Sequence, residues 1–413
     1  MVESADTRVF LSVYHDTPGR RLSRAGVTLS RRLENGLNVW HFELPADRGV
    51  RSVEQPGGPA APPPQITHLL TGFVRGERLE PVLRFQTRRR NGTDEVEVLE
   101  GHHRRLGTFT TATKRVNAAA LEALERPPEH GDRDSIRWLR AQIDGQYAAI
   151  LRADAAIRLG GDPEALHQFR VALRRLQTLL RAARSILEPE WAERLRGELR
   201  WLGRSLGSLR DLDVLSDHLQ SEAARLDERE QRTAGGLLAT LERERESARR
   251  EVQKTISSQR YLELLNSLED AACAPNFRAS ELSLTDFAAA EFRRLRKRMR
   301  TIDQASPDTD LHRARILGKR ARYAAELAEA QVGKPASRFV RHAKRFQDVL
   351  GAHQDAIVAE ARLRGLLRSS RSTGAAFAAG RLVERERSRR RSARAELPKA
   401  WKKLGRQGTR AWA

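Results

Sequence analysis

The chain has 413 residues and a formal net charge of +22, with 39% hydrophobic and 31% charged residues. This length suits two or three domains, and the hydrophobic fraction is large enough for a buried core. The single cysteine, Cys273, excludes an intrachain disulfide and a cysteine-rich zinc site, and favours a reducing compartment. No apolar run approaches the roughly 20 residues that span a bilayer, and MVESADTRVF lacks the pattern of a signal peptide. We therefore expect a cytoplasmic protein without membrane insertion.

The positive charge is unevenly distributed along the chain. Residues 1–132 carry 19 basic and 17 acidic side chains, whereas residues 133–413 carry 57 and 37. A basic excess concentrated in one region indicates a polyanionic partner, which could be a nucleic acid, an anionic membrane or inorganic polyphosphate.

The N-terminal part has the pattern of a small α+β unit. Residues rich in Val, Phe, Tyr and Trp predict strands at 8–17, 37–44 and 82–90. A short helix and a further strand are expected before the Asn35-Gly36 turn, and helical spacing returns at 66–75. Residues 55–64 (QPGGPAAPPP) predict a loop.

From about residue 132 onward, long amphipathic segments predict a mainly helical domain. Breaks are expected at Gly160-Gly161, Glu188-Pro189, Pro275, Pro307 and Gly333–Pro335. The helices so delimited are 134–158, 163–187, 190–205, 210–228, 233–257, 261–271, 283–301, 309–330, 337–350, 355–370 and 376–404.

One of these helices carries an unusual cationic stripe, in the segment HQFRVALRRLQTLLR at 167–181. At 3.6 residues per turn, His167, Arg170, Arg174 and Arg181 fall within about 60° of one another. Phe169 and three leucines fall on the opposite side. One face is therefore aliphatic, and the other is basic and lacks any acidic residue.

The stripe occurs twice. In HRARILGKRAR at 312–322, four basic residues match four of the first segment at a constant offset of 145: His312, Arg315, Lys319 and Arg320 correspond to His167, Arg170, Arg174 and Arg175. The motif LGxxxD also recurs, ending at Asp211 and at Asp355 with an offset of 144. Two motifs at nearly constant separation indicate a duplicated helical bundle with approximate two-fold symmetry.

These segments, together with LGSLRDLDVL and FQDVLGAHQDA, resemble the CHAD domain, the conserved histidine α-helical domain. The resemblance covers residues 132–405, with repeats at about 132–257 and 281–405. It implies a pseudo-two-fold pair of four-helix bundles around a basic groove that binds polyphosphate. It also implies association with polyphosphate granules.

Residues 1–110 are similar to a CYTH domain in the segments YHDTP, RRLSRAGVTLSRR, WHFELP and RFQTRR. CYTH enzymes are triphosphate tunnels that use a divalent metal held by an ExExK strand. No such strand precedes Tyr14, Glu43 stands where relatives usually have lysine, and Glu95-Val96-Glu97 is a remnant of the late acidic strands. Because this chemistry needs several carboxylates on one ion, we assign no metal, cofactor or catalytic residue and expect a degenerate, non-catalytic domain. Residues 111–131 would be a linker and 406–413 a tail.

The residue types suit a phosphate polymer. Arginine binds two phosphate oxygens at once, whereas lysine acts as a point charge. Arg170 and Arg174 repel each other on an isolated helix, and a bound polyanion would turn that repulsion into attraction. The predicted polyphosphate-binding residues are His167, Arg170, Arg174, Arg175, Arg181, Arg200, His312, Arg315, Lys319, Arg320, Arg322 and Lys344, with Arg204, Arg210 and Arg341 ranked lower. We expect Asp211 and Asp355 to cap helices or orient arginines.

Three alternatives remain open at this point. A basic helical face is often only solvated, although keeping two such faces in phase argues against that interpretation. The same charge could bind an RNA or DNA backbone, but aromatic residues are only 5% of the chain and, on the two stripes, only Tyr323 could stack a base. A residual triphosphate-hydrolysing CYTH enzyme is the third alternative.

Overall fold

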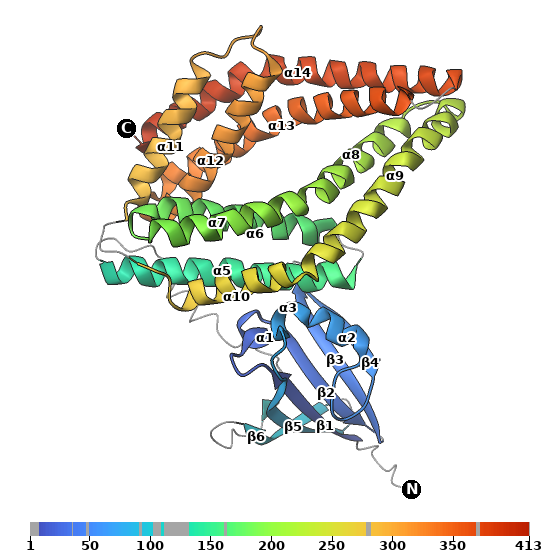
Figure 1. The fold of residues 1–413 in the computed structure, drawn as a ribbon, viewed down its shortest axis with the longest axis vertical. Coiled ribbons are helices and arrows are strands. Elements are labelled where there is room, and N and C mark those ends of the chain that lie inside the picture. The colour runs from blue at the N-terminus through green and yellow to red at the C-terminus, as the bar shows by residue number, and fades with distance from the viewer. Residues whose placement is uncertain are drawn as a thin grey trace. The chain divides into compact units, whose positions relative to one another are not determined.

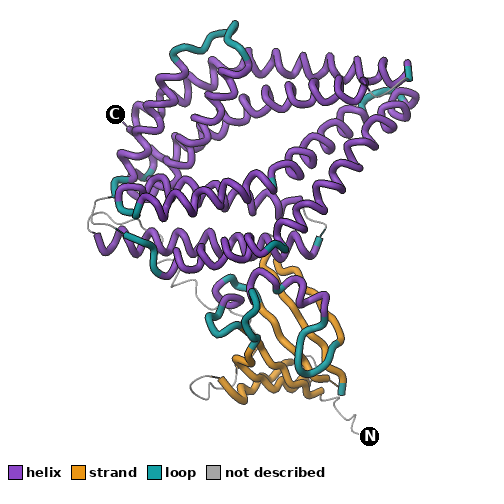
Figure 2. Tube along the Cα trace, viewed as in Figure 1, coloured by secondary structure: helices purple, strands orange, loops and turns teal. Residues whose placement is uncertain are grey.

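The computed structural model describes residues 8–34, 36–46, 49–90, 93–101, 109–110, 132–160, 163–277, 282–368 and 372–412 (Figures 1 and 2). The chain divides into two compact units. The N-terminal unit comprises Met1–Glu122, Asp144–Leu173 and Ile256–Glu269, and the helical unit comprises Ala123–Ile143, Arg174–Thr255 and Asp270–Ala413. The predicted linker at 111–131 lies outside the described residues.

The N-terminal unit contains an antiparallel sheet in the order β4-β3-β2-β1-β5-β6-β7. Its strands are β1 (Arg8–Asp16), β2 (Thr28–Glu34), β3 (Leu37–Ala46), β4 (Gly49–Pro56), β5 (Glu80–Arg90), β6 (Thr93–Gly101) and β7 (Phe109–Thr110). The predicted strands are confirmed in β1, β2, β3 and β5. Strand β4 was not predicted, because its residues are exposed or half-buried and lack an apolar face.

Three short helices accompany the sheet: α1 (Arg21–Arg24), α2 (Pro64–Leu69) and α3 (Thr71–Val74). The unit buries Trp40 and Phe42 of β3 together with Ile66 of α2 and Phe73 of α3. Trp40 donates its indole hydrogen bond to the carbonyl oxygen of Gly58 at 2.9 Å. The proline-rich loop therefore closes over the tryptophan.

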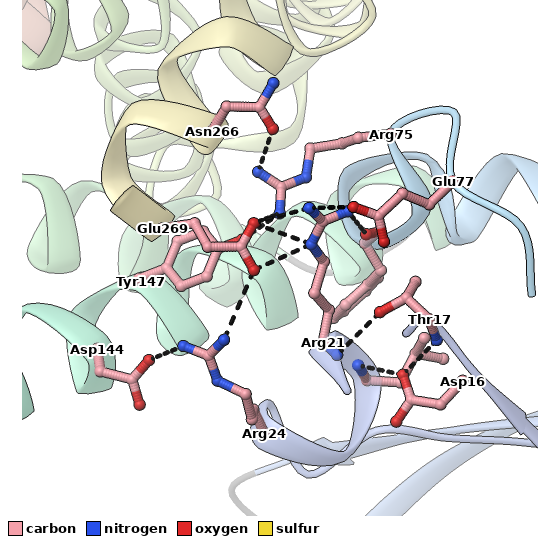
Figure 3. Close-up of polar contacts among 12 residues, drawn as sticks. Asp16, Thr17, Arg21, Arg24, Arg75, Glu77, Asp144, Tyr147, Asn266 and Glu269 are labelled. Carbon is pink, nitrogen blue, oxygen red and sulfur yellow. Dashed lines mark hydrogen bonds and ion pairs between the residues drawn. The ribbon is translucent and has the colours of Figure 1, made fainter. Parts of the chain in front are cut away.

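A compact polar cluster joins α1 and α3 to α5 (Asp132–Leu159) and α10 (Gln259–Cys273) within the N-terminal unit (Figure 3). Its centre is Glu269, whose carboxylate accepts two hydrogen bonds from Arg21 Nε at 2.9 and 3.0 Å. Arg75 donates to the same carboxylate at 2.5 Å, and Arg24 lies 3.5 Å from it. One carboxylate thus holds three guanidinium groups from two elements of the sheet region.

The surroundings of Glu269 determine its ionisation. Burial by itself raises the pKa of Glu269, but the hydrogen bond from Arg21 and the charge of Arg75 bring it below its ordinary value. Arg75 also donates to the hydroxyl of Tyr147 at 2.6 Å. The cluster is therefore built around an ionised carboxylate.

The remaining helices show the duplication directly. They are α6 (Pro163–Ala182), α7 (Pro189–Ser205), α8 (Gly207–Ala223), α9 (Glu228–Ile256), α11 (Leu284–Met299), α12 (Asp308–Val332), α13 (Lys334–Arg368) and α14 (Thr373–Trp412), with a 3-10 turn at Ala183–Ser185. Helices α12, α13 and α14 each begin 145 residues after α6, α7 and α9. The predicted duplicated, mainly helical fold is confirmed.

Two helix predictions were wrong at their boundaries. Residues 337–350 and 355–370 belong to one helix, α13, because Gly351 is packed inside it and does not end it. The tail expected at 406–413 is part of α14, which continues to Trp412. The Trp412 ring packs edge-on against Phe339 with ring centroids 5.8 Å apart, and this contact holds the end of the helix.

Among the described residues, two apolar clusters connect the helices of the second repeat with one another and with α8 and α9. The first joins α11, α12, the beginning of α13 and the end of α14 around Phe292, Phe339 and Phe346. The second joins α8, α9, the end of α13 and the beginning of α14 around Leu219 and Leu363. Helices α13 and α14 run through both clusters as a long hairpin (Figure 1). Among the described helices, none has a segment long and apolar enough to cross a membrane.

We predict that Glu269→Gln destabilises the fold by about 1–3 kcal/mol at neutral pH, because three arginines then surround a neutral amide. Glu269 has a lowered pKa, so its contribution is complete above the ordinary carboxyl pKa of 4.5 and declines as the pH falls below that value. Urea denaturation at several pH values measures this difference.

The matched control is Glu251→Gln, since Glu251 is exposed and its carboxylate pairs with Lys254 three residues later on the same helix. Its effect should stay within about 0.5 kcal/mol. Equal stability of the two variants at neutral pH would contradict the role assigned to Glu269.

Candidate polyanion-binding site

The second cationic stripe lies along one face of α12. Its members recur every three or four residues, the spacing that keeps side chains on one side of a helix. The opposite side of α12 is buried in the apolar core, including Leu311, Ala314 and Ala321. Within it His312, Arg315, Lys319 and Arg322 share one side of the helix, with Glu326 one turn further on. Arg320, which the sequence matched to Arg175, lies near Arg181 instead.

Helix α12 packs closely on α13 at Gly318. A Cβ atom at this position would lie 2.9 Å from the ring of Phe346. Gln347 donates a hydrogen bond to the Gly318 carbonyl oxygen at 3.0 Å. Glycine is therefore required here by the separation of the two helices, and this contact fixes the position of the stripe relative to α13.

One turn away, the guanidinium of Arg315 lies against Gly351 of α13, 3.9 Å from where a Cβ atom would stand. Asp355 follows one turn later on α13. Burial raises the pKa of Asp355, while the charges of Arg315, Arg389 and Lys319 oppose that rise. The LGxxxD motif of the second repeat thus contributes two groups beside the stripe. Its glycine packs against Arg315, and its carboxylate faces the stripe.

At the beginning of the stripe, His312 is exposed and its Nδ1 lies 3.0 Å from the side-chain oxygen of Gln354. Gln354 belongs to the same LGAHQD segment. The motif therefore contacts α12 at both His312 and Arg315.

Part of the first stripe meets α12 inside the helical unit. The guanidinium carbons of Arg174 and Arg322 lie 5.8 and 4.7 Å from the centre of the buried Tyr323 ring. Glu326 lies nearby, and burial raises its pKa although Arg322, Arg175 and Arg174 act to lower it. Three predicted arginines from two helices are therefore gathered around one ring and one half-buried carboxylate.

Arg181 occupies a different environment. It lies over the Phe287 ring at 5.5 Å and 3.9 Å from the buried carboxylate of Glu291. Burial lowers its pKa, with Arg320 among the charges that lower it further. Arg181 and Arg320 thus form a second group, in which Arg181 is partly covered.

The structure gives the other predicted residues separate positions. His167 and Arg170 are half-buried members of the N-terminal unit. Arg200 is exposed and donates to Glu193 at 2.7 Å. Lys344, Arg204, Arg341 and Asp211 are exposed, and Arg210 is half-buried. Their participation in binding stays a prediction.

Sequence reasoning missed three residues beside Asp355. His218 Nε2 lies 2.6 Å from the buried carboxylate of Glu386 and 3.1 Å from Arg389. These side chains come from α8 and α14 and lie far apart in the sequence. The only available signal was the basic segment ERERSRRRSAR, which contains Arg389.

No group of three or more His, Cys, Asp or Glu side chains placed to hold a metal ion occurs among the residues that the structure describes. The charged groups assembled on α12 are mainly donors of hydrogen bonds with positive charge. Their chemistry suits the binding of phosphate oxygens.

Comparison with known proteins identifies relatives of the whole chain and of its helical part. A family model described as "CHAD domain" matches residues 141–364. An uncharacterized protein of Mycobacterium tuberculosis strain H37Rv is 28% identical over 483 aligned positions, covering 98% of this chain and 91% of the relative.

Two solved structures share the helical fold. The structure titled PptA from Streptomyces chartreusis has a TM-score of 0.55 and 24% identity, covering 64% of this chain and 98% of that chain. The CHAD domain from the plant Ricinus communis has a TM-score of 0.53 and 26% identity, covering 65% of this chain and 90% of that domain.

We predict that Glu326→Gln leaves the free energy of unfolding unchanged at pH 7 or increases it by up to about 1 kcal/mol. The reason is that a carboxyl with a raised pKa opposes folding when ionised, and this cost disappears as the pH falls through the raised value. Thermal or urea denaturation between neutral and mildly acidic pH measures the effect.

Glu193→Gln provides the comparison of opposite sign, since the hydrogen bond from Arg200 lowers the pKa of Glu193. The Glu193 variant should be slightly less stable than the parent at pH 7. A larger loss for Glu326→Gln than for Glu193→Gln would show that Glu326 stabilises the fold as an ion pair.

Proposed function

Because the chain belongs to the CHAD domain family, we propose that it binds inorganic polyphosphate, without catalysis, through the cationic faces of α6 and α12. One observation carries the proposal: equivalent helices, beginning at Pro163 and Asp308, carry the same pattern of basic residues on the same face. A merely solvated surface does not require that its charges stay in phase after duplication. A polymer of repeated phosphates does, because each phosphate needs its own donor.

The electrostatics of the stripe support this choice. Arg315, Lys319 and Arg322 lie one turn apart on α12, so each is repelled by its neighbour unless an anion lies between them. Their acidic neighbours, Asp355 and Glu326, are both half-buried. Three cations lie beside these two carboxylates, so the stripe keeps a positive charge, as a polyanion site requires.

The environment of Tyr323 favours polyphosphate over nucleic acid. Single-strand nucleic-acid binders stack bases on exposed aromatic rings. Tyr323 is 6% exposed and lies beneath the guanidinium groups of Arg174 and Arg322. The aromatic ring of the stripe therefore supports arginines and offers no surface to a base.

The proposal extends to the rest of the chain. The antiparallel sheet would be a degenerate CYTH-like domain that acts as a structural partner of the helices. Binding would place the protein on polyphosphate granules in the cytoplasm. RNA or DNA backbone binding is the alternative that the second test below addresses.

Replacing Arg170, Arg174, Arg315 and Lys319 together with alanine should weaken binding of long-chain polyphosphate by about 100-fold or more, because four charge-assisted contacts are lost. Helicity measured by circular dichroism should not change. Isothermal titration calorimetry gives the affinity.

The matched control removes four exposed cations that pair with carboxylates three residues earlier on their own helices: Arg225, Arg249, Lys254 and Arg313. This variant has the same net charge as the test variant. If both variants lose the same affinity, binding depends on overall charge and the proposed site is wrong.

Competition distinguishes the two polyanions. We expect long-chain polyphosphate to displace a labelled single-stranded RNA at equal concentration of phosphate groups, because the site offers donors and no stacking surface. Fluorescence anisotropy follows the displacement. RNA displacing polyphosphate under the same conditions would favour the nucleic-acid alternative.

A further inference from the structure

We propose that four arginines on α14 form a second phosphate-binding site, which holds a further section of the polyphosphate chain bound by α12. We call Arg387, Arg390, Arg391 and Arg394 the α14 strip. The inference rests on the proposed function and adds to it a separate surface. It also explains a set of charges that neither cationic stripe includes.

The α14 strip lines an open cavity of about 400 Å³. Its members are spaced by three, one and three residues, so all four project from one face of the helix. The strip is roughly 10 Å long at 1.5 Å per residue. Four guanidinium groups on one face repel one another, and bound phosphates remove that repulsion.

The inner half of the α14 strip is held rigidly by the beginning of α12. Arg390 and Arg394 both bind the carboxylate of Asp308, with Arg394 at 2.7 Å. Arg394 also donates to the carbonyl oxygens of Gln304 and Ser306, each at 2.8 Å. Ordered guanidinium groups lose little further freedom on binding a ligand, which favours affinity.

The ionisation of Asp308 agrees with this arrangement. Burial alone raises the pKa of Asp308, but hydrogen bonds from Arg394 and Arg390 bring it below its ordinary value. The single negative charge of Asp308 is shared by two arginines. The group of three side chains therefore retains a net positive charge.

The outer half of the α14 strip is open to solvent. The side chains of Arg387 and Arg391 are 44% and 66% exposed. Arg387 contacts Glu360 at 3.0 Å, and Arg391 contacts Glu384 at 2.8 Å. Ion pairs of this kind contribute little to stability, so a polyanion can replace them.

The α14 strip adjoins the α12 stripe through Asp308 and His353. Asp308, which binds Arg390 and Arg394, stands one helical turn before His312. His353 lies 3.2 Å from both Asp308 and Arg394, and its neighbour Gln354 contacts His312. A chain that leaves the α12 stripe at His312 therefore reaches the α14 strip within about one helical turn.

The α14 strip lies outside residues 141–364, the part of the chain matched by the family model. The second site lies on α14, the counterpart of α9 in the second repeat. It would lengthen the path available to one polyphosphate molecule, and its effect should depend on the length of the ligand.

The test variant is Arg387→Gln with Arg391→Gln. These side chains are exposed, and Glu360 keeps its contact with Arg364 at 3.1 Å, so no buried charge is left without a partner. The matched control is Arg249→Gln with Lys254→Gln, which removes two exposed cations from α9. Affinities are measured by calorimetry on the full chain with tripolyphosphate and with a long-chain polyphosphate.

We expect the test variant to bind long-chain polyphosphate about 3- to 10-fold more weakly at low salt and to bind tripolyphosphate as the parent does. The slope of log affinity against log salt for the long chain should fall by about one to two, for two lost phosphate contacts. The control variant should match the parent within about twofold for both ligands.

Two results would overturn the second site while leaving the proposed function intact. One is a test variant that matches the control in long-chain affinity and salt slope. The other is an equal loss with both ligands, which would make the α14 strip part of the primary site. Failure of the parent protein to bind either ligand would overturn both proposals.

Discussion

The close contact between α12 and α13 at Gly318 determines where the cationic face points. Phe346 occupies the space that a side chain at Gly318 would need, and Gln347 bonds to the glycine carbonyl. With this register fixed, Arg315 comes to lie against Gly351 one turn away. At Gly318 only glycine fits, whereas a Cβ atom at Gly351 would make ordinary contact with Arg315. The charges are thus positioned by packing, and their mutual repulsion is opposed by the apolar core beneath them.

Duplication explains how the two halves of the helical fold meet. The second apolar cluster contains four pairs of residues separated by 144 positions: Leu215 with Ala359, Leu219 with Leu363, Ala234 with Ala378, and Leu238 with Leu382. Equivalent residues gather in one cluster when a two-fold axis passes through it. Polar contacts between the two repeats show a similar relation.

These polar contacts are reciprocal. His218 of α8 contacts Glu386 of α14, and Arg362 of α13, 144 residues after His218, contacts Glu244 of α9. In each case a basic side chain from one repeat meets a carboxylate from the other. The contacts between the two repeats therefore have the symmetry expected of two like halves that associate, although both halves belong to one chain.

The sequence predicts those features that depend on local chemistry. Pro163, Pro189 and Pro307 mark helix starts because proline suits the beginning of a helix and opposes its continuation. The spacing of basic residues predicts His312, Arg315 and Lys319 on one face, and the structure gives them that spacing on a continuous helix. Spacing does not identify the neighbouring element, so Glu291 of α11 could not be assigned as the partner of Arg181. Asp355 was expected to orient an arginine, and Glu326 lies one turn after Arg322 on the same helix.

The wrong predictions for the boundaries of α13 and α14 have the same origin. The sequence predicts separate helices at 337–350 and 355–370, but α13 continues through the buried Gly351, which packs against Arg315 of α12. The sequence predicts a tail at 406–413, but the ring of Trp412 packs against Phe339. In both places a distant residue decides the local structure. Arg181 shows the converse for function, since it shares the stripe of α6 and yet lies against Phe287 and Glu291.

The position of the carboxylates decides what the cationic face can attract. Asp355 and Glu326 are half-buried, and burial raises the pKa of each despite the arginines nearby. Glu193 instead lies exposed beside Arg200, whose hydrogen bond lowers its pKa. An exposed carboxylate competes with an approaching phosphate for the same guanidinium. On the α12 stripe the basic side chains outnumber the two carboxylates, so donors remain for phosphate oxygens even where a carboxylate orients an arginine.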